Sequence, residues 1–371
     1  MAFSFFRKKK NNKDKVETPK TSRYFNLTVK DIIQETADAI TIVFEQPEQK
    51  ISYLSGQFLT LIIPIEGKEV RRAYSLCTSP FVDEDLAVTV KRVQGGLMSN
   101  YLPDHLKKGE VIRVMEPMGT FTTDYEHTNK RHVVLFAGGS GITPMMSIIK
   151  SILHQEPDSI VSLIYANRNI ESIIFKDAFA RMETDNEGRL HLVHILDDAP
   201  MNWQGYSGLL NHEMLSKLFQ RIPDWGIEST TYLMCGPEGM MNNVETLLAA
   251  HDIPKDRIFK ESFVAGIIGK DDKKGDAETL EERQVTIRYD GEEHELTVAA
   301  GTTILETALD QGIDLPYSCQ SGLCTACRGK CLSGKVKLDE EDGLSDEELS
   351  QGYILTCVGH PLTDNVVIEI G

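Results

Sequence analysis

The chain has 371 residues, of which 41% are hydrophobic and 26% charged, and its formal net charge is −17. This length predicts two or three domains, each able to bury a hydrophobic core. The negative charge argues against nucleic acid as the main partner, because no excess of positive charge is available to neutralise phosphates. No apolar run reaches the roughly 18 residues of a transmembrane segment, and the amino terminus lacks the apolar core of a secretory signal. We therefore expect a cytoplasmic protein.

The first 265 residues of the chain change character twice. Residues 1–22 are polar and rich in lysine, which predicts a disordered basic tail. From 23 to 127, short β-type runs such as YFNLTVKDI and FLTLIIPI alternate with turn residues, and their even spacing predicts an antiparallel β-barrel. From 128 to 265, strand-like runs such as RHVVLFAGG alternate with helix-like runs such as TPMMSIIKSILHQ. This alternation predicts an α/β domain with a parallel sheet.

The last quarter of the chain reads as a third domain. Residues 266–283 are rich in glycine, lysine and acidic residues, which predicts a linker. Residues 284–371 begin with a hairpin pattern that has Asp290-Gly291 at its turn, continue with a helix-like run and a cysteine-rich loop, and end with a strand-like run. The composition and order predict a small α+β domain.

Four cysteines in this last domain have a characteristic spacing. Cys319, Cys324 and Cys327 are separated by four and two residues, and Cys357 follows at a distance. This pattern is the plant-type [2Fe-2S] signature, in which three thiolates come from one loop and one from a distant segment. A structural zinc site is the alternative, but it usually takes two Cys or Cys/His pairs, and His360 is the only such neighbour of Cys357. The spacing favours the cluster.

Two motifs in the predicted barrel suit a flavin nucleotide. In EVRRAYSLCTSP, Arg72 can pair with a phosphate, the Tyr74 ring can stack on a flavin, and the Ser75 hydroxyl can donate a hydrogen bond to a ring nitrogen. In VKRVQGGLMSNYL, Gly95-Gly96 directly precedes a predicted helix, whose first backbone N–H groups can hold a pyrophosphate. Each motif is short and also fits an ordinary structural role.

Three motifs in the predicted α/β domain suit a nicotinamide nucleotide. LFAGGSGITPMMSI reads as a strand, a glycine-rich turn and a helix, although it is not the G-x-G-x-x-G fingerprint. In YANR, Arg168 follows the next strand, and no acidic residue stands there to bind a ribose hydroxyl; Arg168 therefore favours the 2′-phosphate of NADPH. In LMCGPEGMM, Cys235 ends a strand at a Gly-Pro turn, where parallel sheets bind ligands.

Taken in order, these motifs resemble the ferredoxin–NADP reductase superfamily across residues 24–265. LPYSCQSGLCTACRGKC and GYILTCVGHPLTDNVVIEI resemble plant-type ferredoxins, with their β-grasp fold, across 284–371. The resemblance implies FAD, a [2Fe-2S] cluster and NADPH or NADH as cofactors. The expected site residues are Ser75, Cys235 and Phe263 at the reacting centre, with Glu261 beside Phe263. Cofactor contacts are expected from Arg72, Tyr74, Ser75, Lys91, Gly96, Met98, Ser99, Gly139, Gly141, Thr143, Arg168, Gly236 and Pro237. The cluster ligands are expected to be Cys319, Cys324, Cys327 and Cys357.

The domain order also resembles the reductase components of bacterial oxygenases, among them those of phenylacetyl-CoA epoxidase and of steroid hydroxylases. This resemblance implies transfer of electrons from NAD(P)H through FAD and the cluster to an oxygenase component or another one-electron acceptor protein, with phenylacetate catabolism as one setting. The alternative is a flavin, haem or quinone reductase whose C-terminal domain is a metal-stabilised interaction module. The iron content of the purified protein separates the two.

Overall fold

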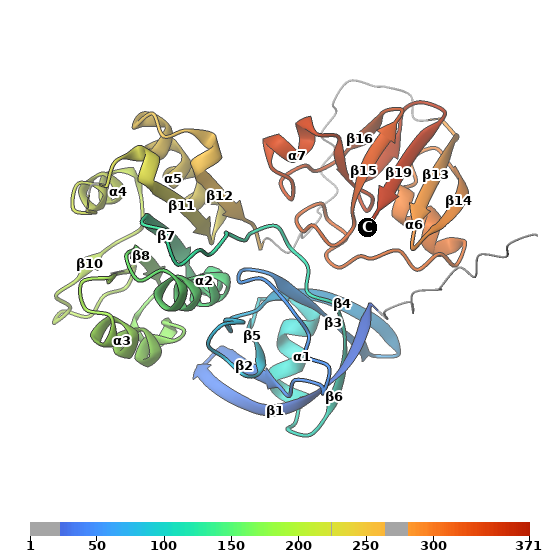
Figure 1. Ribbon diagram of the computed structural model, residues 1–371. Coiled ribbons are helices and arrows are strands. Elements are labelled where there is room, and N and C mark those ends of the chain that lie inside the picture. The colour runs from blue at the N-terminus through green and yellow to red at the C-terminus, as the bar shows by residue number, and fades with distance from the viewer. Residues whose placement is uncertain (1–22, 224, 264–280) are drawn as a thin grey trace, which may run out of the picture.

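The computed structural model describes residues 23–223, 225–263 and 281–371 (Figure 1). The predicted basic tail and most of the predicted linker lie outside these residues. Three folded units follow one another along the chain, and each is built on its own β-sheet (Figure 1). No helix within the described residues is both long and apolar enough to span a membrane.

The first unit, called the barrel here, is an antiparallel six-stranded sheet in the order β4-β3-β6-β1-β2-β5. A bridge between Leu76 and Val88 joins the two ends of this order and closes the barrel. Leu59, Leu61 and Val114 point inward and are fully buried. The elements are β1 (Tyr24–Thr36), β2 (Ala39–Phe44), β3 (Phe58–Ile65), β4 (Lys68–Ser75), β5 (Leu86–Lys91), α1 (Leu97–His105) and β6 (Val111–Met115).

The second unit, called the nucleotide domain here, is a parallel sheet in the order β10-β9-β8-β7-β11-β12. Strands β8 and β11 lie on opposite sides of β7, so the chain changes direction there, and such a switch point opens a crevice at the carboxyl ends of the strands. The strands are β7 (His132–Gly138), β8 (Ile160–Asn167), β9 (Leu190–Leu196), β10 (Tyr206–Ser207), β11 (Thr230–Cys235) and β12 (Ile258–Glu261). The helices are η1 (Gly139–Gly141), α2 (Ile142–Gln155), η2 (Ile170–Ser172), α3 (Lys176–Asp185), α4 (His212–Phe219), η3 (Ile227–Ser229), α5 (Glu238–Ala250) and η4 (Lys255–Arg257).

The third unit, called the ferredoxin domain here, has a mixed sheet in the order β14-β13-β19-β15-β17 and a separate β16-β18 pair. Strands β13 and β19 are parallel, and α6 contacts the sheet at β14. Asp290 and Gly291 both have positive φ, as the predicted hairpin turn requires. The elements are β13 (Arg283–Tyr289), β14 (Glu292–Val298), α6 (Ile304–Asp310), β15 (Arg328–Ser333), β16 (Val336–Leu338), α7 (Asp346–Ser350), β17 (Tyr353–Leu355), β18 (Gly359–Pro361) and β19 (Val366–Ile370).

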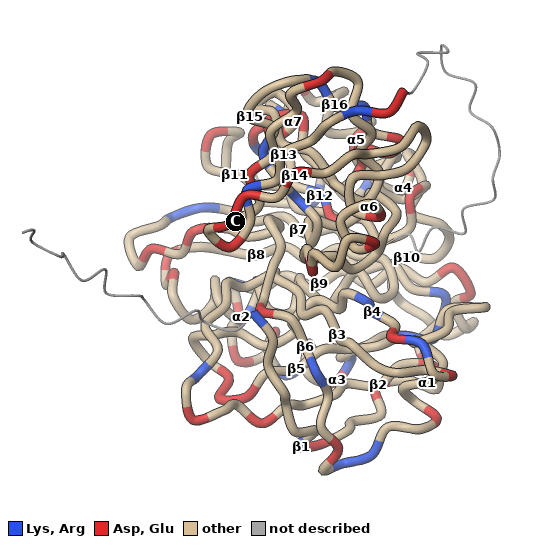
Figure 2. The backbone as a smooth tube through the Cα atoms, turned by 90° about the vertical axis from the view of Figure 1, so that its right-hand side faces the viewer, with Lys and Arg blue, Asp and Glu red and all other residues tan. Residues whose placement is uncertain are grey.

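Acidic and basic residues occur along the backbone of all three units, so the acidic residues are not confined to one of them (Figure 2). The ferredoxin domain carries an acidic first turn on α7, where Ser345 and Glu348 form a reciprocal capping box. Its acidic residues are therefore partly explained by helix capping.

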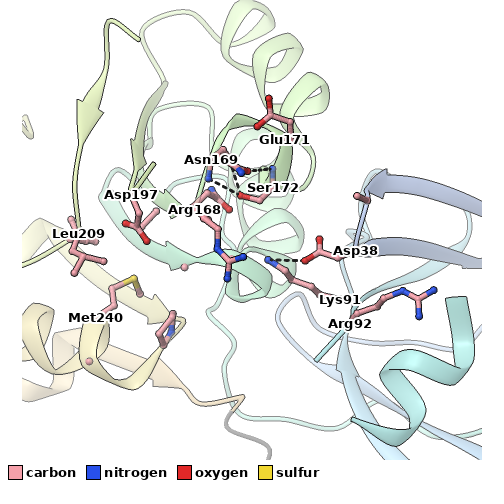
Figure 3. A pocket seen from close by; sticks show the side chains of 18 of the residues that line it. Asp38, Lys91, Arg92, Arg168, Asn169, Glu171, Ser172, Asp197, Leu209 and Met240 are labelled. Atoms are coloured by element: carbon pink, nitrogen blue, oxygen red, sulfur yellow. Dashed lines mark hydrogen bonds and ion pairs between the residues drawn. The ribbon is translucent and has the colours of Figure 1, made fainter. Parts of the chain in front are cut away.

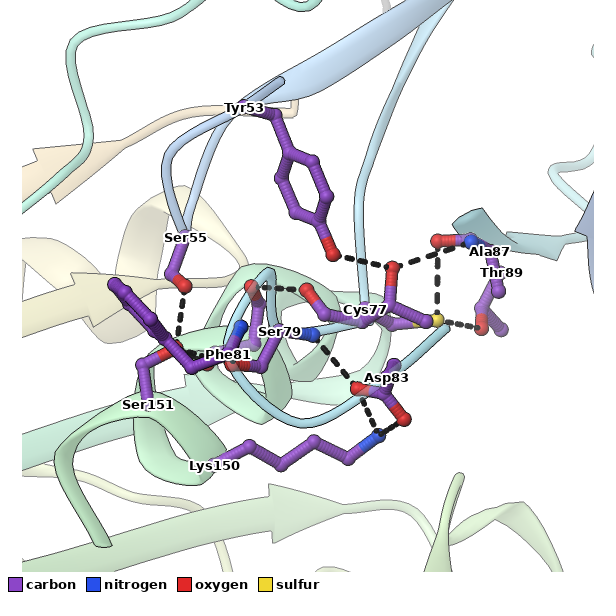
Figure 4. Close-up of polar contacts among 12 residues, drawn as sticks. Tyr53, Ser55, Cys77, Ser79, Phe81, Asp83, Ala87, Thr89, Lys150 and Ser151 are labelled. Carbon is purple, nitrogen blue, oxygen red and sulfur yellow. Dashed lines mark hydrogen bonds and ion pairs between the residues drawn. The ribbon is translucent and has the colours of Figure 1, made fainter. Parts of the chain in front are cut away.

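A network of hydroxyl groups and one ion pair joins the barrel to the nucleotide domain (Figure 4). Ser151 on α2 lies 2.5 Å from the Ser55 hydroxyl and 2.7 Å from that of Ser79. Lys150, on the same helix, lies 3.0 Å from both carboxylate oxygens of Asp83. These contacts hold α2, which starts at the glycine-rich turn, in a fixed position relative to the barrel.

A buried ion pair stabilises the base of the nucleotide domain. The Glu156 side chain at the end of α2 is fully buried, and its carboxylate accepts hydrogen bonds from Arg131 at 2.7 and 3.0 Å and from Asn129 at 2.9 Å. A buried carboxylate needs such partners because it has lost its hydration.

Replacing Arg131 by Ala leaves this carboxylate buried without its cation, and we expect a loss of about 3–5 kcal/mol in the free energy of unfolding. Both tryptophans of the chain, Trp203 and Trp225, lie in this domain, so their fluorescence during unfolding reports on it alone. The control is Lys217→Ala, which breaks an exposed pair with Glu213 and is expected to change stability by less than about 1 kcal/mol. Equal stability of the two variants would contradict the role assigned to Arg131.

Candidate functional site

Two glycine-containing turns meet at the carboxyl ends of β7 and β11. A Cβ atom on Gly141 would lie 2.0 Å from the carbonyl oxygen of Cys235, and one on Gly138 would lie 2.5 Å from a ring carbon of Pro237. A Cβ on Gly236 would lie 2.9 Å from the backbone nitrogen of Gly138. The turns pack backbone against backbone, so larger residues do not fit. This contact forms a shallow cradle at the switch point of the sheet.

The cradle opens into a cavity of about 810 Å³ between the nucleotide domain and the barrel (Figure 3). Gly139 and Arg168 line it from the nucleotide domain, and Lys91 lines it from the end of β5 in the barrel. Met240 of α5 lines the cavity on the side opposite Lys91 (Figure 3). This volume is in the range of pockets for small molecules and cofactors. Predicted contact residues from both domains therefore meet around one cavity.

The cavity contains charges of both signs. Lys91 lies 3.8 Å from Asp38, and Arg168 extends into the cavity from the end of β8 (Figure 3). Asp197, at the end of the neighbouring strand β9, also lines it; burial raises the pKa of this carboxyl, and Arg168 partly offsets the shift. Asp197 was not predicted from the sequence, where no acid was found near Arg168. Asp197 could have been predicted from its position directly after β9, because the carboxyl ends of parallel strands meet at the same edge of the sheet.

Three residues from two domains converge at the expected reacting centre. Ser75, the last residue of β4, is 3% exposed, and its hydroxyl donates a 3.3 Å hydrogen bond to Glu261 on β12. Cys235 is directly opposite Glu261 in the β11–β12 pairing and is fully buried. Phe263 is 38% exposed and follows β12 by two residues. The structure thus brings Ser75, Cys235 and Glu261 together and places Phe263 close by in the chain.

Burial controls the protonation of this centre. It raises the pKa of Glu261 to about 8, although the hydrogen bond from Ser75 acts in the opposite direction. Burial, with a further contribution from Glu261, raises the pKa of the Cys235 thiol well above its usual value. Cys235 is therefore a neutral thiol near neutral pH and not a nucleophile, because nucleophilic cysteines need a lowered pKa. Glu261 carries a proton over much of the physiological range.

The start of α1 has the features of a phosphate site. Gly96 is its N-cap, and among the described residues no side chain caps the first turn, which leaves its N–H groups for a ligand. A Cβ on Gly96 would lie 2.4 Å from the Ser99 hydroxyl. Met98 and Ser99 are buried beneath this turn. The predicted pyrophosphate contacts are therefore adjacent to one another.

Arg72 and Tyr74 lie on β4, near the start of α1. The Arg72 guanidinium donates a 2.7 Å hydrogen bond to the carbonyl of Arg71, and burial raises the pKa of the Tyr74 hydroxyl. Arg72 lines a second cavity, of about 360 Å³, together with Leu97 at the start of α1. These positions fit the phosphate and ring contacts expected for FAD.

The four cysteines of the predicted cluster site converge although Cys357 is distant in sequence. The Cys319 thiol lies within hydrogen-bond reach of Cys324 and Cys357, and the Cys327 thiol within reach of Cys357. Contact with Cys324 lowers the pKa of the Cys319 thiol, and the backbone N–H of Ser321 donates to its sulfur at 3.4 Å.

This arrangement fits a two-iron cluster. Cys319, Cys324 and Cys327 come from one loop and Cys357 from a distant segment, which is the plant-type pattern. A [2Fe-2S] cluster needs four thiolates spread over two irons, whereas a structural zinc needs four ligands around one centre. The thiol of Cys331 instead contacts the carbonyl of Ser333 at 3.2 Å, outside the group of four.

Comparison with known proteins identifies the three units. The model described as oxidoreductase FAD-binding domain matches residues 24–123, and the oxidoreductase NAD-binding domain matches residues 135–246. The 2Fe-2S iron-sulfur cluster binding domain matches residues 287–362. The chain is 35% identical to one of the subunits of 1,2-phenylacetyl-CoA epoxidase from Escherichia coli K12, and the match covers 93% of this chain and 97% of that protein.

A second relative is the ferredoxin reductase component of 3-ketosteroid-9-alpha-monooxygenase from Rhodococcus rhodochrous. It is 37% identical, over 95% of this chain and 99% of its own length. The solved structure of phthalate dioxygenase reductase has the same fold, with a TM-score of 0.57 and 22% identity over 94% of this chain and 98% of that one.

The chain belongs to the ferredoxin–NADP reductase family, in the branch that carries a C-terminal [2Fe-2S] ferredoxin domain. It is an NAD(P)H-dependent oxidoreductase that uses FAD and a [2Fe-2S] cluster. The predicted fold class, cofactors and reaction class are confirmed. The domain boundaries and the roles of individual site residues stay predictions.

The raised pKa of Glu261 predicts a pH dependence of stability. Between pH 4.5, the ordinary value, and about pH 8, the folded protein holds a proton on Glu261 that the unfolded chain has released. The nucleotide domain should therefore lose stability as the pH rises through this window, and Glu261→Gln should flatten that part of the profile. Tryptophan fluorescence measures the unfolding midpoint, with the exposed Glu213→Gln as control. The same slope in wild type and Glu261→Gln would contradict the assignment.

Proposed function

We propose that this protein takes electrons from NADPH and delivers them through FAD and the [2Fe-2S] cluster to an oxygenase component. The first acceptor to consider is the oxygenase of phenylacetyl-CoA epoxidase, because the chain matches one subunit of that system along nearly its whole length. The steroid monooxygenase relative, at similar identity, supports the same chemistry with another acceptor.

The lining of one cavity supports the proposed route of electrons within the chain. The cavity of about 360 Å³ is lined on one side by Arg72 and Leu97, which belong to the FAD motifs of the barrel. On the other side it is lined by Tyr317 and Ser318, the two residues before the expected cluster ligand Cys319. Residues of the expected FAD motifs and of the expected cluster loop therefore line one cavity, and this proximity supports direct electron transfer between the two sites.

The residues of the chain have distinct roles in this proposal. The turns at Gly139 and Gly141, with Thr143 in the first turn of α2, hold the nicotinamide dinucleotide, and Arg72 with the start of α1 holds the phosphates of FAD. When bound, FAD would supply both hydride and one-electron chemistry, and a cluster held by the four cysteines would supply one-electron chemistry. Glu261 accepts the Ser75 hydrogen bond at its Oε2 atom and is protonated near neutral pH, so it can give or take a proton at its Oε1 atom.

We place the protein in the cytoplasm, because none of its seven cysteines, all of which the structure describes, is paired in a disulfide. The alternative acceptor is free flavin, a haem or a quinone. The metal-stabilised interaction module that the sequence left open does not fit the 2Fe-2S iron-sulfur cluster binding domain that matches residues 287–362.

The preference for NADPH rests on Arg168, which lines the nucleotide cavity. Replacing Arg168 by Ala should raise the KM for NADPH by about tenfold or more, as expected for loss of a charged hydrogen bond of roughly 1.5–3 kcal/mol, with little change for NADH. Asp197→Asn serves as the matched variant, because removing this negative charge should not weaken binding of a phosphate. Steady-state kinetics with both nucleotides gives the answer. An unchanged KM for both in Arg168→Ala would contradict the preference.

The acceptor is tested by reconstitution. Mixed with the oxygenase subunits of phenylacetyl-CoA epoxidase, the protein should oxidise NADPH faster when phenylacetyl-CoA is added, and should form the epoxide. Cys357→Ser removes an expected cluster ligand and leaves the FAD motifs intact, so this variant should keep NADPH-dependent flavin reduction but lose the coupled reaction. No stimulation by substrate with the wild-type protein would rule out this acceptor.

A further inference from the structure

A charged side chain is almost fully buried where the barrel meets the ferredoxin domain. The side chain of Arg71, on β4, is only 7% exposed. Its guanidinium lies 2.8 Å from Glu69 on the same strand and 3.3 Å from Asp314 of the ferredoxin domain. Arginine is seldom this buried unless it is paired, so these partners account for its position. The contact spans 243 residues of sequence.

Two tyrosines complete the group. The guanidinium carbon of Arg71 lies 4.2 Å from the ring centre of Tyr317, and one of its nitrogens donates a 3.3 Å hydrogen bond to the Tyr24 hydroxyl. Tyr24 in turn donates a 2.7 Å hydrogen bond to Asp314. We call this set the Arg71 cluster: Tyr24, Glu69, Arg71, Asp314 and Tyr317. A planar guanidinium can stack on a ring and pair with carboxylates at the same time, which lysine cannot do.

Two members of the Arg71 cluster belong to the segment that leads into the loop of expected [2Fe-2S] ligands. Tyr317 stands two residues before the expected ligand Cys319, and Asp314 opens the same segment. Arg71 is the direct neighbour of Arg72 on β4, and both line the cavity that Tyr317 and Ser318 also line. A shift of Arg71 would therefore change the distance between the FAD site and the loop that holds three of the four cysteines.

The other described contacts of the ferredoxin domain are weaker. Arg23 lies 5.0 Å from the ring centre of Tyr289, at the edge of the same interface. Lys255 of the nucleotide domain pairs with Asp346, but these side chains are 87% and 75% exposed, and exposed pairs contribute little. Among the described residues, the hydrophobic core of the ferredoxin domain contains only residues of that domain. The position of the domain therefore depends strongly on the Arg71 cluster.

We propose that Arg71 is a positioning residue for electron transfer, which holds the loop around Cys319 against the FAD site. This inference rests on the proposed relay. For each NAD(P)H oxidised, one proton is released and two electrons cross this interface one at a time to the one-electron acceptor. Arg71 takes up neither electron nor proton; it fixes the distance that the electrons cross.

The test uses the holoprotein with FAD and cluster, mixed with NADPH without oxygen in a stopped-flow instrument. In Arg71→Ala the flavin should be reduced at the wild-type rate, whereas the cluster should be reduced about tenfold more slowly or worse, since misplacing reacting groups by about 1 Å can cost on the order of a hundredfold. The matched control Arg288→Ala removes an exposed arginine that pairs with Glu293 within the ferredoxin domain. In this control the rates of flavin reduction and of cluster reduction should both stay at the wild-type values.

A pair of variants at Tyr317 tests the inference without touching the FAD motif. Tyr317→Phe keeps the ring under Arg71 and should transfer electrons normally, whereas Tyr317→Leu loses the ring and should slow the cluster step only. In all variants the dithionite-reduced cluster should keep its EPR signal and midpoint potential, which shows that the cluster itself is intact. Small-angle X-ray scattering should show a larger radius of gyration for Arg71→Ala and Tyr317→Leu than for Tyr317→Phe.

Cluster reduction at the wild-type rate in both Arg71→Ala and Tyr317→Leu would overturn the inference and leave the proposed function intact. Failure of NADPH to reduce the cluster in the wild-type protein would instead contradict the proposed function. The two failures are therefore distinguishable in one experiment.

Discussion

Electrons cross between cofactor sites only when the sites are held close together, and in this protein each site belongs to a different folded unit. The barrel is the central unit in this respect. Ser75 at the end of β4 contacts Glu261 of the nucleotide domain, and Arg71 on the same strand contacts Asp314 of the ferredoxin domain. One strand therefore takes part in both interfaces, and the geometry of the whole relay depends on it.

The two interfaces of the barrel differ in their chemistry. Against the nucleotide domain, barrel residues such as Cys77 and Phe121 join the same hydrophobic core as α2, and the hydroxyl groups of Ser55, Ser79 and Ser151 add a polar network. Against the ferredoxin domain, the described contacts are ionic and aromatic, and no hydrophobic core is shared among the residues that the structure describes. Polar interfaces between domains permit relative motion more readily than apolar ones. The barrel and nucleotide domain form the firmer pair.

Sequence patterns predicted the parts of the site that lie close together in the chain. The spacing of Cys319, Cys324 and Cys327 is a local requirement of one loop, and the order of the glycine-rich turns follows from the strands that precede them. Ser75 and Glu261 were each expected near the flavin, but their hydrogen bond joins residues 186 positions apart. No periodicity or spacing encodes such a pairing.

Arg71 shows the same limit more clearly. In the sequence it stands beside Arg72, the residue expected to bind FAD, and nothing distinguishes it from an exposed arginine on a strand. Its function depends on Asp314 and Tyr317, which the fold brings to it from another domain. Asp197 was missed for a related reason, because its contribution to the nucleotide cavity depends on β9 lying next to β8. Sequence patterns predict features within one strand, helix or loop, but they do not predict these contacts between distant elements.

The proposed relay converts a two-electron donor into single electrons at an iron–sulfur centre within one polypeptide. Its most direct test is an anaerobic titration of the purified holoprotein with NADPH, followed by visible absorption and low-temperature EPR. The flavin absorption should bleach while the EPR signal of a reduced [2Fe-2S] cluster grows in the same titration. Full bleaching of the flavin with the cluster still oxidised, or a protein with no iron–sulfur signal at all, would contradict it.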